Sequence, residues 1–139
     1  MSWDSIWDKI FAENEWGKYP SENLIQFIAR NYYKSQRDKI NILEIGCGPG
    51  ANIWYLSREG FKAFGIDGSK IAISKAINRI KKEGLTAELE VGDVEKLPYD
   101  NNYFDTVIDN ECLFANTYKS SEKINSEIKR VMKVGGFFL

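Results

Sequence analysis

The sequence predicts an α/β fold in which helices cover both faces of a mostly parallel, doubly wound sheet. From residue 39 onward, short apolar runs alternate with helical segments, and strands that alternate with helices form parallel sheets through right-handed crossovers. A glycine-rich turn joins the first of these strands to the helix that follows it. The 139 residues are 43% hydrophobic and 28% charged, which is the balance of one globular core.

The N-terminal part predicts two amphipathic helices. Over residues 3–11, large apolar side chains recur at spacings of three and four, which is typical of one helical stripe. Ser21 is placed to cap a second helix, which we expect to end near Tyr33. We therefore divide the chain into N-terminal helices with a connecting segment, residues 1–38, and an α/β core, residues 39–139.

Strands and helices alternate through the predicted core. The expected strands cover residues 40–45, 62–66, 88–91, 104–108 and the last apolar run, 137–139. The expected helices cover a segment around 53–56 that Gly60 closes, residues 70–82 with Ser69 as cap, and residues 121–131. The last strand would leave apolar residues at an open edge, which natural sheets usually cover. We therefore expect a shortened member or a fragment of a longer design, with this edge as a candidate surface for self-association.

Composition and charge argue against two classes of partner. The longest apolar runs are far below the roughly 20 residues that cross a bilayer. A net charge of −1 does not favour binding to nucleic acid. One predicted helix does carry a basic cluster, which consists of Lys75, Arg79, Lys81 and Lys82. We interpret this cluster as the solvated face of an amphipathic helix.

Cysteine and histidine usage restricts the compartment and the chemistry. Cys47 and Cys112 have no disulfide-framework spacing, and the start of the chain has no signal-peptide pattern, so we expect a cytoplasmic protein. The chain contains no His, which excludes a His-centred base or metal site. We expect no metal.

The glycine-rich turn after the first core strand is the strongest local signal. Gly46, Gly48 and Gly50 permit unusual backbone angles, and the following helix offers free N–H groups at the carboxyl-end crevice where open parallel sheets bind ligands. A tight turn that binds nothing is the alternative. Gly46-x-Gly48-x-x-Ala51 also fits a dinucleotide fingerprint, with Asp67 placed 21 residues after Gly46. Because both kinds of cofactor carry a ribose, the turn alone leaves the choice open.

Four motifs follow one another along the core. They are Glu44-Ile45-Gly46-Cys47-Gly48-Pro49-Gly50, Gly92-Asp93-Val94-Glu95-Lys96-Leu97-Pro98, Phe104-Asp105-Thr106-Val107-Ile108-Asp109 and Arg130-Val131-Met132-Lys133-Val134-Gly135-Gly136. In this order they resemble the motifs of the class I S-adenosylmethionine-dependent methyltransferases, in particular the small-molecule type, over almost all of residues 39–139. The resemblance implies a Rossmann-like fold and S-adenosyl-L-methionine as cofactor. The chain would then stop after the fifth strand, without the family's sixth and seventh strands.

The resemblance also implies roles for single residues. Glu44 matches the acidic position near the methionine end of the cofactor, and Asp93 and Val94 match the positions that meet the adenine amino group and the adenine ring. The expected cofactor-binding residues are Glu44, Gly46, Cys47, Gly48, Gly50, Asp67, Gly68, Asp93, Val94, Asp109 and Tyr19. Alternatives stay open: Asp67 and Asp93 can be turn-forming or capping acids, and Glu44 can anchor the turn through backbone N–H groups.

Two further segments match variable parts of the family. Residues 16–22 resemble a lid over the donor, in which Trp16 or Tyr19 would face the sulfonium, although aromatic side chains also pack in cores. Asp109 and Glu111 are the candidate catalytic bases, against the alternative of solvated loop acids. Cys112 is a weaker candidate, because unactivated thiols commonly fill cores.

Three functions follow from these patterns. The first is an enzyme that methylates a small molecule. The second is a donor-binding module, or an inactive fragment of a longer methyltransferase, because the acceptor pocket of the family often includes the strands that this chain lacks. The third, a nicotinamide dehydrogenase, is disfavoured by Glu44 and by the Asp93 segment.

Overall fold

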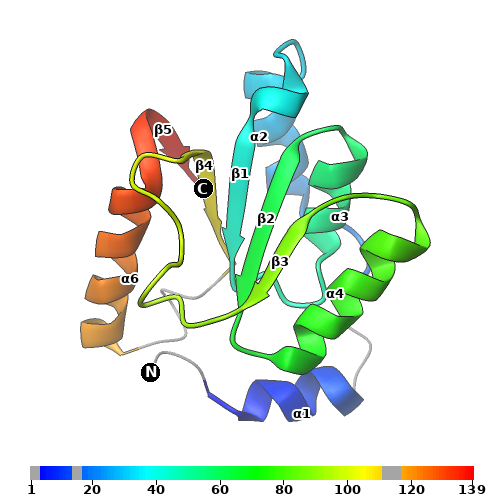
Figure 1. Cartoon of the computed structure of the whole chain (residues 1–139), viewed down its shortest axis with the longest axis vertical. Helices are drawn as coiled ribbons and strands as arrows, with labels where there is room; N and C mark the ends of the chain where they lie inside the picture. The colour runs from blue at the N-terminus through cyan, green and yellow to red at the C-terminus, as the bar shows by residue number, and fades with distance from the viewer. Residues whose placement is uncertain (1–3, 14–16, 111–116) are drawn as a thin grey trace.

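Five parallel strands form one sheet, in the order β3-β2-β1-β4-β5. The computed structural model describes residues 4–13, 17–110 and 117–139 (Figure 1). The elements are α1 (Ile6–Glu13), α2 (Glu22–Tyr32), a 3₁₀ turn (Arg37–Lys39), β1 (Asn41–Ile45), α3 (Ala51–Arg58), β2 (Lys62–Asp67), α4 (Lys70–Lys82), β3 (Glu88–Val91), β4 (Phe104–Asp109), α6 (Tyr118–Val131) and β5 (Met132–Phe138). The α/β class, the parallel sheet and the alternation of strands and helices are confirmed.

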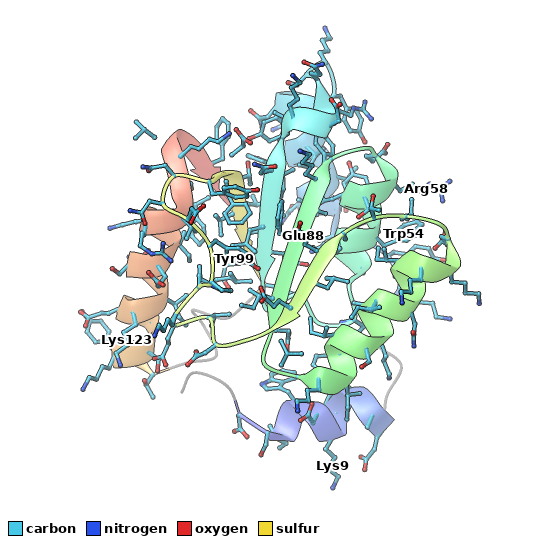
Figure 2. The ribbon with its side chains drawn as sticks, in the orientation of Figure 1. Lys9, Trp54, Arg58, Glu88, Tyr99 and Lys123 are labelled. Atoms are coloured by element: carbon cyan, nitrogen blue, oxygen red, sulfur yellow. The ribbon has the colours of Figure 1, made fainter. Side chains whose placement is uncertain are left out.

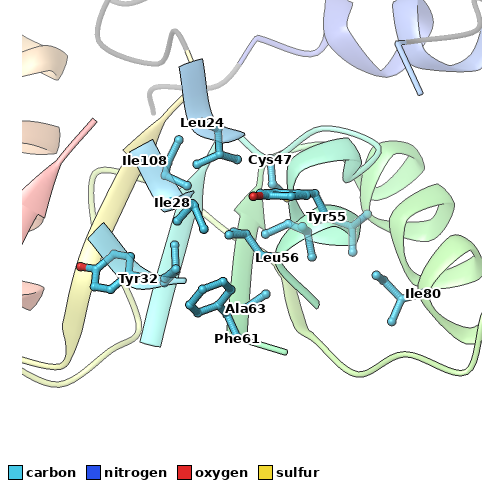
Figure 3. Close-up of a cluster of buried hydrophobic side chains, with 13 residues drawn as sticks. Leu24, Ile28, Tyr32, Cys47, Tyr55, Leu56, Phe61, Ala63, Ile80 and Ile108 are labelled. Carbon is cyan, nitrogen blue, oxygen red and sulfur yellow. The ribbon is translucent and has the colours of Figure 1, made fainter. Parts of the chain in front are cut away.

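Two apolar clusters lie on opposite faces of the sheet. Helices α2, α3 and α4 cover one face, where the buried side chains include Leu24, Ile28, Leu56, Phe61 and Ile80 (Figure 3). Helix α6 covers the other face, where the buried side chains include Leu43, Phe64, Leu97, Phe104, Ile124 and Ile128. Successive strand residues point to opposite faces, so neighbours such as Ile42 and Leu43 enter different clusters. Both faces of the sheet are therefore covered, as in doubly wound folds.

Side-chain caps fix the beginnings of three helices. The hydroxyl oxygen of Ser21 accepts the N–H of Leu24, and the hydroxyl oxygen of Ser69 accepts the N–H of Ala72, as the sequence predicts. The expected start of the last helix at residue 121 is wrong by three residues. Thr117 caps α6 through the N–H of Ser120, so the helix begins at Tyr118.

The expected fifth strand is also longer than the sequence indicates. Strand β5 begins at Met132, directly after α6, and its pairing with β4 is interrupted between Phe104 and Thr106. Gly135 lies in this irregular stretch with a left-handed φ of 79°. Glycine adopts this conformation without the steric cost that a Cβ would carry, which suits the irregularity. Its position is set by pairing with β4, which no local pattern reveals.

The outer residues of β5 are exposed and apolar. They are Val134, Phe137 and Phe138, together with Leu139 directly after the strand, and Val134 is 98% exposed. The open edge is therefore present, and self-association through it stays a prediction. No helix within the three described ranges is long and apolar enough to cross a membrane.

The two N-terminal helices take different positions. Helix α2 lies in the core, where the hydroxyl of Tyr32 hydrogen bonds that of Thr106 over 2.7 Å. Helix α1 lies at the carboxyl ends of the strands, beside the beginning of α4 (Figure 1). The expected helix over residues 3–11 begins later and extends to Glu13.

Candidate functional site

The glycine-rich turn follows β1 and is hydrogen bonded to the end of β2. The N–H groups of Gly46 and Cys47 both donate to the carbonyl oxygen of Ile66, at 2.8 and 3.2 Å. Gly46, Gly48 and Gly50 all have left-handed φ angles, of 68°, 55° and 88°. A residue with a Cβ adopts this conformation only at a cost. The three glycines are thus required by the path of the backbone.

Close packing below the turn explains the adjoining small residues. A Cβ at Gly50 would lie 2.9 Å from the Cβ of Ala76, which brings α3 and α4 close together. A Cβ at Gly65 would lie 2.9 Å from the Sγ of Cys47. The Cys47 side chain is 3% exposed and belongs to the core. Its thiol donates to the carbonyl oxygen of Gly48 at 3.7 Å, so a contact with a ligand at Cys47 would be a backbone contact.

Asp67 ends β2 and connects the neighbouring turns. Its carboxylate accepts the N–H of Gly48 and the N–H of Ser69, each at 2.9 Å, and its carbonyl oxygen accepts the N–H of Gly92 at 3.0 Å. Burial raises the pKa of Asp67, while the two backbone hydrogen bonds oppose that rise. The turn-forming role that the sequence left open is therefore present, and a ribose contact stays a prediction.

Glu44, the penultimate residue of β1, is a fully buried acid. Its Oε2 accepts a hydrogen bond of 2.6 Å from the side-chain amide of Asn52 in α3. Its Oε1 is buried and has no hydrogen-bond partner among the described residues. Burial, together with the negative charges of Asp67 and Asp109, raises the pKa of Glu44 to about 8. The bond to Asn52 is with a side chain, so it is not the backbone anchoring that the sequence left as an alternative.

Asp109 ends β4, next to the end of β1. Its N–H donates to the carbonyl oxygen of Leu139, and the N–H of Asn110 donates to that of Ile45 at 3.2 Å. The acids Glu44, Asp67 and Asp109 thus stand at the carboxyl ends of three adjacent strands. Glu111 and Cys112, the other candidates for proton transfer, lie outside the described residues.

Asp93 forms a tight turn after β3. Its Oδ1 accepts the N–H of Glu95 at 2.9 Å, and its carbonyl oxygen accepts the N–H of Lys96 at 3.0 Å. The following Val94 is 7% exposed and packs into the cluster below α6. Asp93 is therefore turn-forming in the structure, and contacts of Asp93 and Val94 with adenine stay predictions.

Helix α1 covers the glycine-rich turn, which sequence reasoning missed. A Cβ at Gly48 would lie 3.6 Å from the ring of Phe11, which is buried and stacked with Trp7. The hydroxyl of Ser69 donates to a carboxylate oxygen of Asp8. The apolar stripe of the N-terminal helix predicted a packed face for Phe11 but not the partner of that face. Tyr19, the predicted lid residue, is 82% exposed, and Trp16 lies outside the described residues.

Two members of the basic cluster hold the N-terminal segment. The ammonium of Lys75 donates to the carbonyl oxygen of Phe11, and the guanidinium of Arg79 donates to that of Lys18 at 2.6 Å. Arg79 also stacks 4.5 Å from the ring centroid of Trp54, which Figure 2 shows on α3 beside α4. Lys75, Lys81 and Lys82 are exposed and Arg79 is half-buried, as expected of a solvated face, and Lys75 and Arg79 in addition bind the N-terminal segment.

A model of the methyltransferase domain family matches residues 42–136 of the chain, which include the glycine-rich turn and the three strand-end acids. This chain belongs to the methyltransferase domain family. The resemblance to class I S-adenosylmethionine-dependent methyltransferases, drawn from four motifs, is thereby confirmed.

Curated relatives of this methyltransferase domain are longer than it is. It is 34% identical over 91 residues to an uncharacterized methyltransferase of Schizosaccharomyces pombe, and the aligned region covers 66% of this chain and 63% of that protein. It is 32% identical over 99 residues to the phthiotriol/phenolphthiotriol dimycocerosates methyltransferase of Mycobacterium tuberculosis, and the aligned region covers 70% of this chain and 35% of that protein. The chain thus spans between about a third and two thirds of these relatives.

Solved structures share the fold of this methyltransferase domain. One is a protein from a structure titled for the conversion of a disulfide bond into a thioacetal group during echinomycin biosynthesis. The match covers 92% of this chain and 55% of that protein's chain, with a TM-score of 0.80 and 23% identity. Another is a SAM-dependent methyltransferase of Methanosarcina mazei. The match covers 76% of this chain and 52% of that protein's chain, with a TM-score of 0.64 and 28% identity. The Rossmann-like fold class is confirmed.

Proposed function

We propose that this chain binds S-adenosyl-L-methionine and transfers its methyl group to a small-molecule acceptor. The observation that carries the proposal is the buried Oε1 of Glu44, which has no partner among the described residues. A buried polar atom without a partner is costly, and a carboxyl at this place suits a cationic ligand group. Membership of the methyltransferase family supports the choice of the methyl donor over a nicotinamide cofactor.

The residues at the carboxyl ends of the strands fit the donor from end to end. Glu44 would meet the ammonium of the methionine part, and the open backbone of Gly46 and Gly48 would let the donor lie against the turn. Asp67, with the half-buried Gly68 beside it, would accept from the ribose hydroxyls. The turn that begins at Asp93 would face the adenine.

The chemistry is an in-line displacement, for which S-adenosylmethionine supplies a methyl group already activated by a sulfonium charge. The contribution of the chain is alignment, which can be worth roughly 7–11 kcal/mol. Asp109 stands at the end of β4 and is the proposed acceptor of the proton that the methylated group loses. Glu111 would share this role or perform it in place of Asp109. The reaction needs no metal, and no group of three or more His, Cys, Asp or Glu in the described ranges is arranged to hold one.

The acceptor and the setting are further parts of the proposal. The mycobacterial relative is named for phthiotriol acceptors, and we propose the broader class of small molecules for this chain, in the cytoplasm. Because the chain spans only part of its relatives, a donor-binding module without turnover is the second candidate. Formation of S-adenosylhomocysteine in the presence of candidate acceptors would distinguish the enzyme from the module.

Calorimetric titration with S-adenosylhomocysteine and with NAD tests the cofactor. We expect saturable binding of the sulfur ligand alone, and a loss of at least about tenfold in the Glu44→Gln variant. Gln keeps an oxygen for the amide of Asn52, so the fold contact survives. Asp67→Ala is less informative, because it also removes the bonds to Gly48 and Ser69.

Glu88→Gln is the matched control, because it makes the same substitution at an exposed position at the start of β3, the opposite end of the sheet. It should bind as the wild type does. Tighter binding of NAD than of S-adenosylhomocysteine, or equal binding by wild type and Glu44→Gln, would contradict the proposal.

A further inference from the structure

An ion pair on α6 grips the loop between β3 and β4. Arg130 and Glu127 pair at 2.7 Å across one turn of the helix. Glu127 Oε1 accepts the N–H of Leu97 at 2.9 Å, while Arg130 donates to the carbonyl oxygens of Leu97 and Tyr99 at 2.9 and 2.7 Å. Arg130 also donates to the side chain of Asn101 at 2.9 Å. Figure 2 shows Tyr99 on the loop that lies beside α6.

The pair holds the loop on both sides of one residue, Leu97. Glu127 binds the N–H of Leu97 and Arg130 binds its carbonyl oxygen, so Leu97 can neither rotate nor slide along α6 without losing charge-assisted bonds. The hydrogen bond from Arg130 lowers the pKa of Glu127, which keeps the pair ionised. Below the pair, Leu97 packs in one buried cluster with Ile124 and Ile128 of α6. Polar and apolar contacts therefore fix the same point of the loop.

The fixed point lies directly after the turn that begins at Asp93. That turn closes on itself through the N–H groups of Glu95 and Lys96. It is held from below by the buried Val94. A turn with two internal hydrogen bonds moves as a unit, so the position of the Asp93 carboxylate follows the position of Leu97. The pair acts on Asp93 from a distance and has no part of its own in the crevice.

We infer that Glu127 and Arg130 are positioning residues that set the selectivity of the site for the base of the donor, by holding the Asp93 turn against it. The inference rests on the proposed function, in which Asp93 accepts from the adenine amino group. The bonds described for the pair go to Leu97, Tyr99 and Asn101 and not to Glu44 or Asp67, so its loss should weaken recognition of the base alone.

The test compares S-adenosylhomocysteine with S-inosylhomocysteine, in which a carbonyl oxygen replaces the amino group. Wild type should prefer the adenine ligand, because Asp93 accepts from an amino group and repels a carbonyl oxygen. In Arg130→Met the affinity for the adenine ligand should fall about tenfold, the range of one or two hydrogen bonds, with little change for the inosine ligand. Arg130→Lys keeps the charge but not the forked geometry, so its affinity for the adenine ligand should lie between those of wild type and Arg130→Met. It also serves if Arg130→Met does not fold.

Arg37→Met is the matched control. Arg37 likewise pairs with an acid, Glu59, and donates to two carbonyl oxygens, those of Tyr33 and Glu59. These contacts lie near the 3₁₀ turn, at the end of the sheet away from the strand-end acids. It should lower thermal stability without changing the ratio of the two affinities.

The outcomes separate this inference from the proposed function. A wild type that binds neither ligand would refute the proposed function and this inference with it. If wild type binds the adenine ligand and the ratio of the two affinities is the same in wild type, Arg130→Met and Arg130→Lys, the inference alone would be refuted. A shift as large in Arg37→Met would also refute it, because the effect would then be one of general stability.

Discussion

The side-chain amide of Asn52 donates to Glu44 at 2.6 Å, and its oxygen accepts the backbone N–H of Ser21 at 3.0 Å. One amide therefore joins the buried acid of β1 to the residue that caps α2. Since α3 carries Asn52, three elements meet at the acid that we place beside the donor. Glu44 is held from one side only, because its Oε1 has no partner among the described residues.

The stability of the chain should fall with rising pH because of Glu44. Burial raises the pKa of Glu44 from 4.5 to about 8, so between these values the folded chain keeps a proton that the unfolded chain has lost. The contribution of the group is complete below about pH 4.5 and decreases by up to about 1.4 kcal/mol per pH unit until about pH 8. Glu44→Gln should remove this slope.

Urea denaturation at about pH 5, 6.5 and 8 measures the difference. The free energy of unfolding of Glu44→Gln, relative to wild type, should rise steadily over this range, because the variant has no carboxyl to ionise. Glu88→Gln, which is exposed, should show no such trend. A difference between Glu44→Gln and wild type that does not depend on pH would contradict the raised pKa.

Binding of S-adenosylhomocysteine should release a proton from Glu44. At about pH 6.5 the buried carboxyl is mostly protonated, since its pKa is about 8. A ligand ammonium beside it favours the carboxylate, so the proton leaves on binding and affinity rises with pH up to about 8. Calorimetry in two buffers of different ionisation enthalpy counts the proton. Glu44→Gln, titrated at higher concentration, should release none; an equal release there would assign the proton to another group.

Asn52→Ala should destabilise the chain and weaken donor binding together. The substitution leaves Glu44 without any partner among the described residues and also removes the acceptor of the Ser21 N–H, which typically costs about 1–3 kcal/mol for a buried group. Asn31→Ala is the control, because Asn31 makes one exposed bond to the carbonyl oxygen of Phe27 and should cost less than about 0.5 kcal/mol. Chemical denaturation of both variants decides; equal losses would count against the role of Asn52.

The sequence was sufficient for the elements that local chemistry determines. Helix α4 has the expected bounds because an apolar stripe at helical spacing follows a serine cap. Strand β3 likewise has the expected bounds. The start of α6 and the extent of β5 were missed, because β5 is defined by its interrupted pairing with β4 and not by its own residues.

The candidate site divides in the same way. Glu44, Asp93 and Asp109 could be identified because their motifs resemble those of the methyltransferase family, and Asp67 because of its spacing from the glycine-rich turn. All four lie at or just beyond the carboxyl end of a strand, and parallel strands bring these ends to one edge. The contacts of Phe11 with Gly48 and of Asp8 with Ser69 could not, since they join segments that are distant in sequence. Such pairs depend on where α1 docks, and its stripe is compatible with any apolar surface.

Gly50→Ala should be more destabilising than the same change at Gly84. Both glycines have left-handed φ angles, of 88° and 67°, so each alanine pays a backbone cost of roughly 1 kcal/mol or more. A Cβ at Gly84 meets nothing within 4 Å, whereas one at Gly50 would lie 2.9 Å from the Cβ of Ala76 and 3.4 Å from its Cα. The extra cost at Gly50 is therefore the separation of α3 from α4, about 1–3 kcal/mol for an overpacked contact. Because this movement also shifts the turn, Gly50→Ala should weaken S-adenosylhomocysteine binding while Gly84→Ala does not. Equal losses of stability and unchanged binding in both variants would show that the turn tolerates a wider helix spacing than its packing indicates.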